Sequence, residues 1–305
     1  MKPTRFTGSS VICAVVVLAV PPGAAGGPGG PQDAAAAIET ARTQAEPTQA
    51  PDPDLVLDPA QPEFTVVNLP TTLGLSPGRW GFRVSHRFTR DLTAGSFGEQ
   101  LENLFGFDGG AQIGLELRYG LARGWQAGIY RTSDRTIQLF TQYKVVRQSA
   151  SRPIGLDALV VVEGTNNLRR TDPRQPDGRG VRSPAVGAVV SRTAGRAASV
   201  NVTIAWVGNA LVRLDGGLDA AVVAGIGGRL RVRPTVYLVA ETTPRLARDA
   251  PGTALAAFGI EKRVGGHAFQ VHVSNGIGST LAQVARGAPS ADRWHIGFNI
   301  NRKFY

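Results

Sequence analysis

The sequence has little sulfur, little charge and no long apolar run beyond its N-terminal region. Among its 305 residues there is one methionine and one cysteine, and charged residues make up only 18%. After the N-terminus no apolar run reaches the roughly 18 residues that a membrane-spanning helix needs, and this argues against a helical membrane protein. The abundance of glycine, at 38 residues, fits a chain with many turns and strands.

The N-terminus has the features of a secretory signal peptide. Lys2 and Arg5 precede a short apolar core, which is followed by proline and by small residues suited to cleavage. We therefore expect residues 1–25 to be removed. Cys13 lies inside the apolar core and follows Ile12, where lipidation needs a small residue, so we expect no lipid anchor. Without residues 1–25 the chain has no cysteine for disulfides or thiol chemistry.

Residues 26–62 contain much Ala, Pro, Gln and Asp and almost no large apolar side chains. Such a segment buries too little surface to offset its ordering entropy. We predict a disordered periplasmic linker that serves as a spacer, followed by one β-barrel domain over residues 63–305.

The last stretch, residues 293–305, alternates with a period of two. Trp294, Ile296 and Phe298 share one face of a predicted strand, and small or polar residues share the other. In a soluble sandwich the apolar face would point inward. The aromatic chain end, the secretory start and several similar segments favour a transmembrane antiparallel β-barrel in the bacterial outer membrane. Arg302 and Tyr305 break the alternation.

Strand positions follow from the same alternation. We predict strands over residues 80–88, 111–119, 125–131, 136–147, 154–165, 183–193, 197–208, 218–226, 230–242, 253–262, 267–275 and 293–302. An even count of about twelve returns the chain to its starting side, and the longer connections then lie outside. Pro234 inside a predicted strand removes a ladder hydrogen bond, so a count of about ten remains an alternative. Leu101, Leu104 and Phe105 predict a short amphipathic helix in the first connection.

Four motifs resemble a bacterial β-barrel family known as a domain of unknown function. They read WGFRVSHRF, LFGFD, LRYGLARGWQAGIYRTS and QYKVVRQS, and the resemblance is clearest over residues 68–149. The resemblance implies a barrel at the cell envelope. It implies no catalytic or binding residues.

If the apolar faces meet lipid, the opposite faces line the lumen. The candidate lumen-lining residues are Arg83, Arg87, Glu116, Arg118, Lys144, Arg231, Arg233, His272, His295 and Asn299, with Gln142, Glu163, Glu241 and Gln270 on the same parity. Basic residues outnumber acidic ones, so an open pore would attract anions. The alternative is that these charges pair and fill a small barrel. Both interpretations remain open.

One predicted outer loop, residues 166–182, is rich in arginine. Its candidate anion contacts are Arg169, Arg170, Arg174, Arg179 and Arg182. They suit the phosphates of outer-membrane lipid and lipopolysaccharide, although such a loop is more often simply solvated and mobile.

Signals for an enzyme are weak. The histidines lack metal-ligand spacing, and no G-x-S-x-G motif is present. Ser274 with His272 or His295 could imitate the Ser–His pair of an outer-membrane phospholipase. However, a serine and a histidine often lie on the same face of neighbouring strands by chance. We expect no enzyme, no metal, no cofactor and no nucleic-acid partner. The leading hypothesis is passive passage of small solutes, and the alternative is a closed structural or docking barrel for a periplasmic or surface partner. We expect the barrel-assembly machinery to engage the C-terminal strand.

Overall fold

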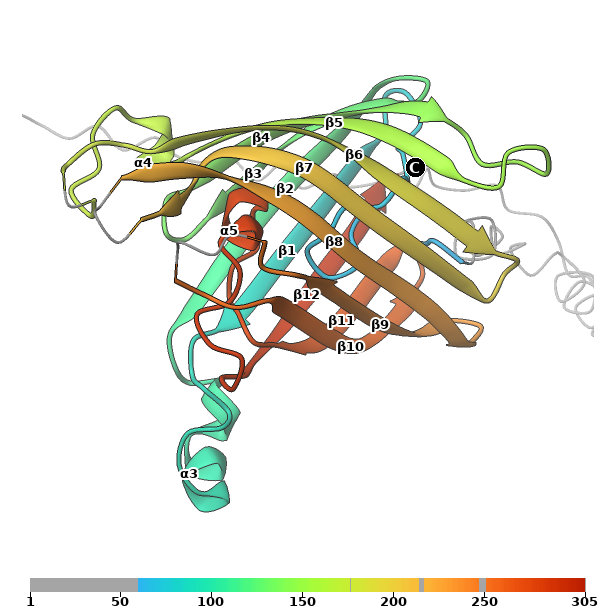
Figure 1. Cartoon of the computed structure of the whole chain (residues 1–305). Helices are drawn as coiled ribbons and strands as arrows, with labels where there is room; N and C mark the ends of the chain where they lie inside the picture. The colour runs from blue at the N-terminus through green and yellow to red at the C-terminus, as the bar shows by residue number, and fades with distance from the viewer. Residues whose placement is uncertain (1–59, 176, 214–216, 247–250, 305) are drawn as a thin grey trace, which may run out of the picture. The chain divides into compact units, whose positions relative to one another are not determined.

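Within the residues that the structure describes, twelve antiparallel strands pair in sequence order and close into one barrel (Figure 1). The computed structural model describes residues 60–175, 177–213, 217–246 and 251–304. The strands are β1 (Trp80–Phe88), β2 (Ala111–Ala122), β3 (Trp125–Thr132), β4 (Ile137–Val146), β5 (Gly155–Gly164), β6 (Arg182–Ala194), β7 (Ala198–Val212), β8 (Leu218–Arg233), β9 (Val236–Thr243), β10 (Leu255–Val264), β11 (His267–Ser274) and β12 (His295–Phe304). The predicted all-β fold and strand number are confirmed. The predicted signal peptide and linker residues 26–59 lie outside the described residues.

Short helical segments occur in the connections: α3 (Phe97–Glu102), η1 (Leu104–Gly106), α4 (Thr165–Leu168) and α5 (Leu281–Ala285). The first two lie where the sequence predicts a short helix. In the described part of the chain, no helix is long and apolar enough to cross a bilayer. We call the mouth where β1 begins and β12 ends the proximal mouth, and the opposite mouth the distal mouth.

Alternation along each strand separates an apolar outside from a filled inside. On β1, Trp80 and Phe82 are exposed on the outer surface, while Arg83 and Arg87 are buried. Because successive strand residues point to opposite faces, the same division continues around the wall. Large apolar residues that stay exposed on it include Leu115, Val160, Val186, Ile204, Val222, Ile260 and Val271.

The boundary between β8 and β9 differs from the prediction. The sequence suggests a turn at residues 227–229, but β8 runs unbroken to Arg233 and the turn contains Pro234. The prediction placed Pro234 within a strand, where it has no N–H for the ladder; the turn accommodates it instead. Gly225 and Gly227 point inward from β8, and their lack of side chains makes room for a segment inside the barrel.

That segment precedes β1 and enters the lumen from the proximal mouth. We call residues 60–75 the plug segment. It forms a tight hairpin, since Thr71 donates its N–H to the Phe64 carbonyl and Val66 donates to the Leu69 carbonyl, each at 2.8 Å. Val66 and Thr71 are fully buried. The sequence analysis predicts no regular structure in this stretch and assigns residues 60–62 to the linker, whereas the structure shows these three residues buried at the start of the plug segment.

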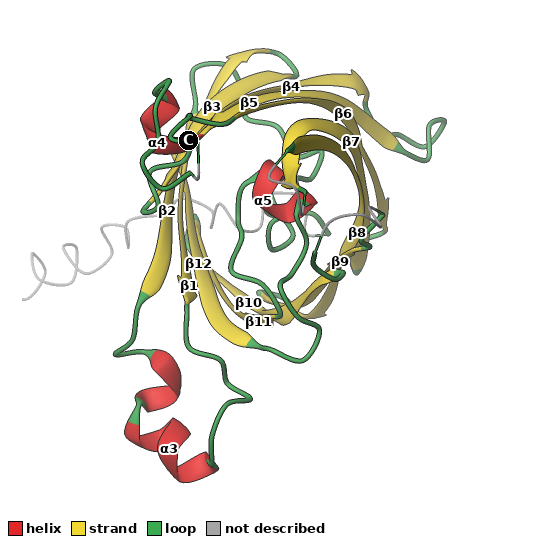
Figure 2. Cartoon of the chain, turned by 60° about the vertical axis from the view of Figure 1, so that its left-hand side comes forward, coloured by secondary structure: helices red, strands yellow, loops and turns green. Residues whose placement is uncertain are grey.

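A second segment enters from the distal mouth. We call residues 275–288, which connect β11 to β12 and contain α5, the inserted loop. Figure 2 shows α5 inside the ring of strands. Thr280 caps α5 by accepting the N–H of Gln283, whose side chain returns to the Thr280 backbone N–H. All residues of α5 are buried, so the predicted outer connection folds inward.

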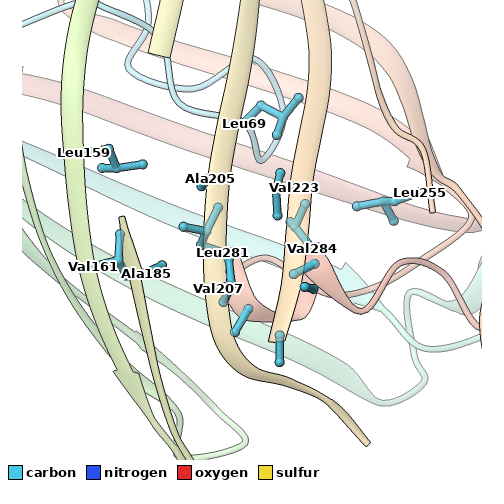
Figure 3. Packing of buried hydrophobic residues seen from close by; sticks show 14 of the residues in the cluster. Leu69, Leu159, Val161, Ala185, Ala205, Val207, Val223, Leu255, Leu281 and Val284 are labelled. Atoms are coloured by element: carbon cyan, nitrogen blue, oxygen red, sulfur yellow. The ribbon is translucent and has the colours of Figure 1, made fainter. Parts of the chain in front are cut away.

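The two segments meet in one apolar cluster inside the barrel (Figure 3). Leu69 of the plug segment and Leu281 and Val284 of α5 pack there. The wall contributes inward-facing residues of β5 to β8, namely Leu159, Val161, Ala185, Val189, Ala205, Val207, Ala221 and Val223. The interior therefore contains an apolar patch on β5 to β8, beside buried polar residues of the same strands such as Glu163 and Arg229, whereas the sequence predicted a polar lining throughout.

Candidate functional site: a lumen sealed from both ends

The centre of the plug segment is held by a single carboxylate. Glu241 on β9 accepts the backbone N–H groups of Val67 and Asn68 at 2.9 Å and of Leu69 at 3.0 Å. Arg87 on β1 donates to the Asn68 side-chain oxygen at 2.9 Å. Buried N–H groups need an acceptor, and the charge on Glu241 strengthens these bonds.

The plug carbonyls face buried donors on β8, β11 and β12. Arg229 and Glu261 form an ion pair at 3.0 Å with both side chains buried, and Arg229 also donates to the carbonyls of Thr65 and Val66. Gln270 donates to the Val66 carbonyl at 2.7 Å, and Asn299 donates to the Val67 carbonyl at 3.0 Å. Wall residues thus form hydrogen bonds to both the N–H groups and the carbonyl groups of the plug backbone.

The ends of the plug segment are fixed near the proximal mouth. Lys303 on β12 pairs with Glu63 at 2.5 Å. Lys144 donates to the Thr72 carbonyl and pairs with Asp157 at 3.1 Å. Next to this contact lies a cavity of about 980 Å³ that opens at the mouth and is lined in part by Lys144, Arg123 and Arg147.

The inserted loop has its own anchors at the distal mouth. Glu163 on β5 accepts the N–H of Ala282 at 3.1 Å, and Gln138 on β4 accepts the N–H of Leu281 at 2.7 Å. Tyr130 on β3 donates its hydroxyl proton to Ser279 at 2.7 Å. The wall thus holds the loop in part through its backbone N–H groups.

Between the two seals a cavity of about 40 Å³ remains, room for a few water molecules. Glu116 lines it and pairs with Arg83 at 2.6 Å and with Arg118 at 2.9 Å. The Arg118 guanidinium stacks over Phe64 of the plug segment at 4.7 Å and over Phe140 of the wall at 4.6 Å. The barrel interior is therefore filled in this conformation.

Most of the residues predicted to line the lumen lie inside the barrel. They are Arg83, Arg87, Glu116, Arg118, Lys144, His272, His295 and Asn299, all of them buried or half-buried. Arg231 and Arg233 lie at the end of β8, next to the turn. Arg231 donates to the Pro234 carbonyl in the β8–β9 turn, and Arg233 is exposed there.

Sequence reasoning missed Arg229, Glu261, Asp157 and Lys303. The sequence predicts a turn at Arg229, and this turn does not form. The other three share the inward parity of their strands, so parity alone would have found them. With these residues included, buried carboxylates accompany the buried cations, and the lumen is less basic than the sequence suggested.

In the described part of the chain, Ser274 makes no hydrogen bond to His272 or His295. Ser274 accepts the N–H of Gly276 at 3.3 Å, and His295 contacts the carbonyl of Arg90. Within the described residues, neither ring nitrogen of buried His272 makes a hydrogen bond. A nucleophilic serine needs a base within hydrogen-bond reach. Among the same residues, no group of three or more His, Cys, Asp and Glu side chains is arranged to hold a metal ion.

The arginine-rich loop contains α4 and is ordered around Asp172. Arg174 donates to both carboxylate oxygens of Asp172 at 2.8 Å, and these hydrogen bonds hold the pKa of Asp172 well below its usual range. Arg179 lies 4.0 Å from Asp177. All five predicted anion contacts, Arg169, Arg170, Arg174, Arg179 and Arg182, are exposed. They are not gathered into one pocket with the lumen residues.

Solved structures of several outer-membrane barrels resemble this chain. The KdgM porin in complex with disordered oligogalacturonate aligns with a TM-score of 0.47 at 7% identity, over 74% of this chain and 99% of that one. The NanC porin gives 0.43 at 11% identity, over 74% and 99%. Outer membrane phospholipase A from Escherichia coli gives 0.40 at 11% identity, over 74% and 92%. No curated protein sequence matches the chain significantly.

A family model gives the assignment. The family described as "Membrane bound beta barrel domain (DUF5777)" matches residues 63–304, which include the plug segment from Glu63 onward and all twelve strands. The match confirms the resemblance that residues 68–149 show to a β-barrel family of unknown function. The chain belongs to this family of membrane-bound β-barrels.

Proposed function

We propose that this protein is an outer-membrane channel for small solutes that is closed at rest, and that withdrawal of the plug segment toward the proximal mouth opens it. The observation that carries the proposal is the contact between Glu241 and the backbone of Val67, Asn68 and Leu69. A wall that holds a separate stretch of chain through polar contacts is suited to release it.

The energetics of these contacts support a reversible seal. A hydrogen bond contributes only about 0.5–1.5 kcal/mol net when water can replace it. If the plug segment leaves, water can enter and satisfy Glu241, Gln270 and Asn299, which are otherwise buried. The main cost of release is the exposure of a few apolar side chains such as Leu69, which adds about 1.5–3 kcal/mol for each fully buried one. The polar half of the lumen then becomes a hydrated path.

The rest of the chain supports an outer-membrane location and an anionic solute. The predicted signal peptide directs export, and the chain enters the barrel at the proximal mouth, which we place in the periplasm. The cavity at that mouth is lined in part by Arg123, Lys144 and Arg147. Their charge favours entry of anions over cations. At the other mouth, exposed Arg169 and Arg170 suit contacts with the phosphates of lipopolysaccharide.

A second candidate is a permanently closed barrel that docks a periplasmic or surface partner. The observation that favours it is the occupation of the lumen from both ends, with Leu69 and Leu281 in the same apolar cluster. On this second account the inserted loop keeps the distal mouth closed even when the plug segment leaves.

Planar-bilayer recordings distinguish the two candidates. We expect the full-length protein to be closed most of the time with brief openings, and Glu241→Gln to stay open longer because the plug segment loses its charged acceptor. Reversal potentials in a salt gradient then report anion preference. If both proteins insert as folded barrels and neither conducts, the docking barrel is the better account.

A further inference from the structure

The connection between β1 and β2 carries several large apolar side chains that stay exposed on the surface. Phe97 and Leu101 on α3 are 75% and 54% exposed, and Leu104 and Phe107 just after it are 57% and 53% exposed. Phe97 is thus more exposed than any large apolar residue on the outer surface of the strands. Contiguous exposed apolar residues of this kind mark an interaction surface.

Two of these side chains form one face of a short helix. Phe97 and Leu101 are four residues apart and share one side of α3, while Glu99 and Glu102 lie on the other. The fold of the connection is fixed from within. Gln100 is buried and donates to the Asp91 carbonyl at 3.1 Å, and Ser96 caps the helix. The apolar face is therefore presented by an ordered structure.

The position of α3 relative to the barrel indicates what covers this face. In Figure 1, α3 stands away from the wall beside the strands, and in Figure 2, seen nearly along the barrel, it lies outside the ring of strands. A segment in this position extends sideways into the plane of the membrane near the distal mouth. It does not cover the lumen.

The apolar face is also continuous with the outer surface of the wall. The Phe107 ring packs against Phe88 at the end of β1, with centroids 4.7 Å apart, and Phe88 lies 6.2 Å from Phe298 of β12. Phe298 belongs to the outward-facing residues of β12 that meet lipid in this membrane-bound barrel. The lipid-facing surface therefore continues through Phe107 onto the connection.

We propose that α3 and η1 form an in-plane membrane anchor whose apolar face, made of Phe97, Leu101, Leu104 and Phe107, inserts into the lipid leaflet at the distal mouth. Amphipathic helices lie in membrane interfaces in this way, with the apolar face in the acyl region and the charged face toward the head groups. The anchor fixes the depth and tilt of the barrel beside β1, and it makes lipid the partner of this surface.

Site-directed fluorescence in lipid vesicles tests the anchor on the full chain. Leu101→Cys in a Cys13→Ser background is labelled with an environment-sensitive dye. Glu102→Cys on the opposite face serves as the matched control, and Val160→Cys on the outer wall of β5 as the lipid-facing reference. Leu104→Cys provides a second position on the apolar face if Leu101→Cys fails to fold. Each variant is challenged with aqueous iodide and with lipids that carry a quencher in the acyl chain.

We expect the label at position 101 to show a blue-shifted emission, to lose emission to the lipid-borne quencher as the label at position 160 does, and to resist iodide. The label at position 102 should be quenched by iodide. Iodide quenching at position 101 equal to that at position 102 would overturn the proposal, because α3 would then stand in water. Protection of position 101 from both quenchers would also overturn it, because another polypeptide would then cover the face.

Discussion

The carboxylate of Glu241 accepts the backbone N–H of Leu69 at a distance of 3.0 Å. The two residues are separated by 172 positions in the chain, and both are buried. Glu163 holds Ala282 of the inserted loop in the same way at 3.1 Å. Each of the two segments that fill the lumen is thus attached to a wall carboxylate through its main chain.

The first prediction concerns the anchor of the plug segment. Glu241→Gln removes the charge and leaves an amide that cannot accept all three N–H groups as well as the carboxylate does. We expect the plug segment to lose about 1–3 kcal/mol of stabilisation, because buried donors are left poorly satisfied. Hydrogen exchange measured by mass spectrometry should show faster exchange at residues 66–70 with the strands still protected.

Glu163→Gln is the matched control for that change, since it removes the same charge from the other anchor. It should speed exchange in the inserted loop around Ala282 and leave residues 66–70 as protected as in the unchanged protein. If both variants loosened both segments equally, the two seals would be one unit and withdrawal of the plug segment alone would be excluded.

The second prediction concerns the space that Gly225 leaves for the plug segment. A Cβ at this position would lie 2.7 Å from Cδ1 of Leu69, closer than side chains approach. Gly225→Val suits the strand itself, because β-branched residues favour strands. We therefore expect the variant to fold as a barrel but to expel Leu69 and raise channel opening. Adding Leu69→Ala should restore part of the closure, since it removes the clash with Leu69 and leaves the contact of the new Cβ with Thr243 Oγ1 at 2.9 Å. A double variant that conducts more than the single one would contradict this account.

The third prediction concerns the buried ion pair beneath the plug segment. Arg229→Met leaves Glu261 buried without its partner, and breaking a buried pair in this way costs about 3–5 kcal/mol. Arg229→Met with Glu261→Met should cost less, because no uncompensated charge remains. The free energy of unfolding in urea, measured in lipid vesicles, checks both values. Equal losses for the single and double variants would show that Arg229 acts through the plug carbonyls instead of through the pair.

Much of the wall could be predicted from the sequence, because strand alternation is a local signal. β1 and β12 show apolar and polar residues on alternating positions, and the predicted residues 80–88 agree with β1 at both ends. The β8–β9 boundary was predicted wrongly, because a run of glycines normally marks a turn. Here Gly225 and Gly227 make room for Leu69 and Val66, a fact that only the distant plug segment explains.

The inward positions of the plug segment and the inserted loop could not be predicted from local sequence patterns. The plug hairpin has no period of two or of 3.6, and its hydrogen-bond partners come from Glu241, Arg229 and Gln270, which lie more than 160 positions away. The inserted loop was correctly predicted as a long connection. Its inward course depends on the small inward side chains of β6 and β7, such as Ala185 and Ala205, which leave space for α5.

The central claim is that the plug segment closes the channel, and a reversible covalent lock tests it. A Cβ at position 155 would lie 3.7 Å from the Cβ of Thr72, within the range of about 3.5–4.5 Å that disulfides need. Thr71, its neighbour, is bonded to the Phe64 carbonyl, so a tether at Thr72 holds the whole hairpin. Thr72→Cys with Gly155→Cys, in a background of Cys13→Ser and Glu241→Gln, is recorded in a planar bilayer before and after a reductant is added. The account predicts a silent barrel when the disulfide is formed and openings within the same recording once it is reduced; equal conductance in the two states would contradict it.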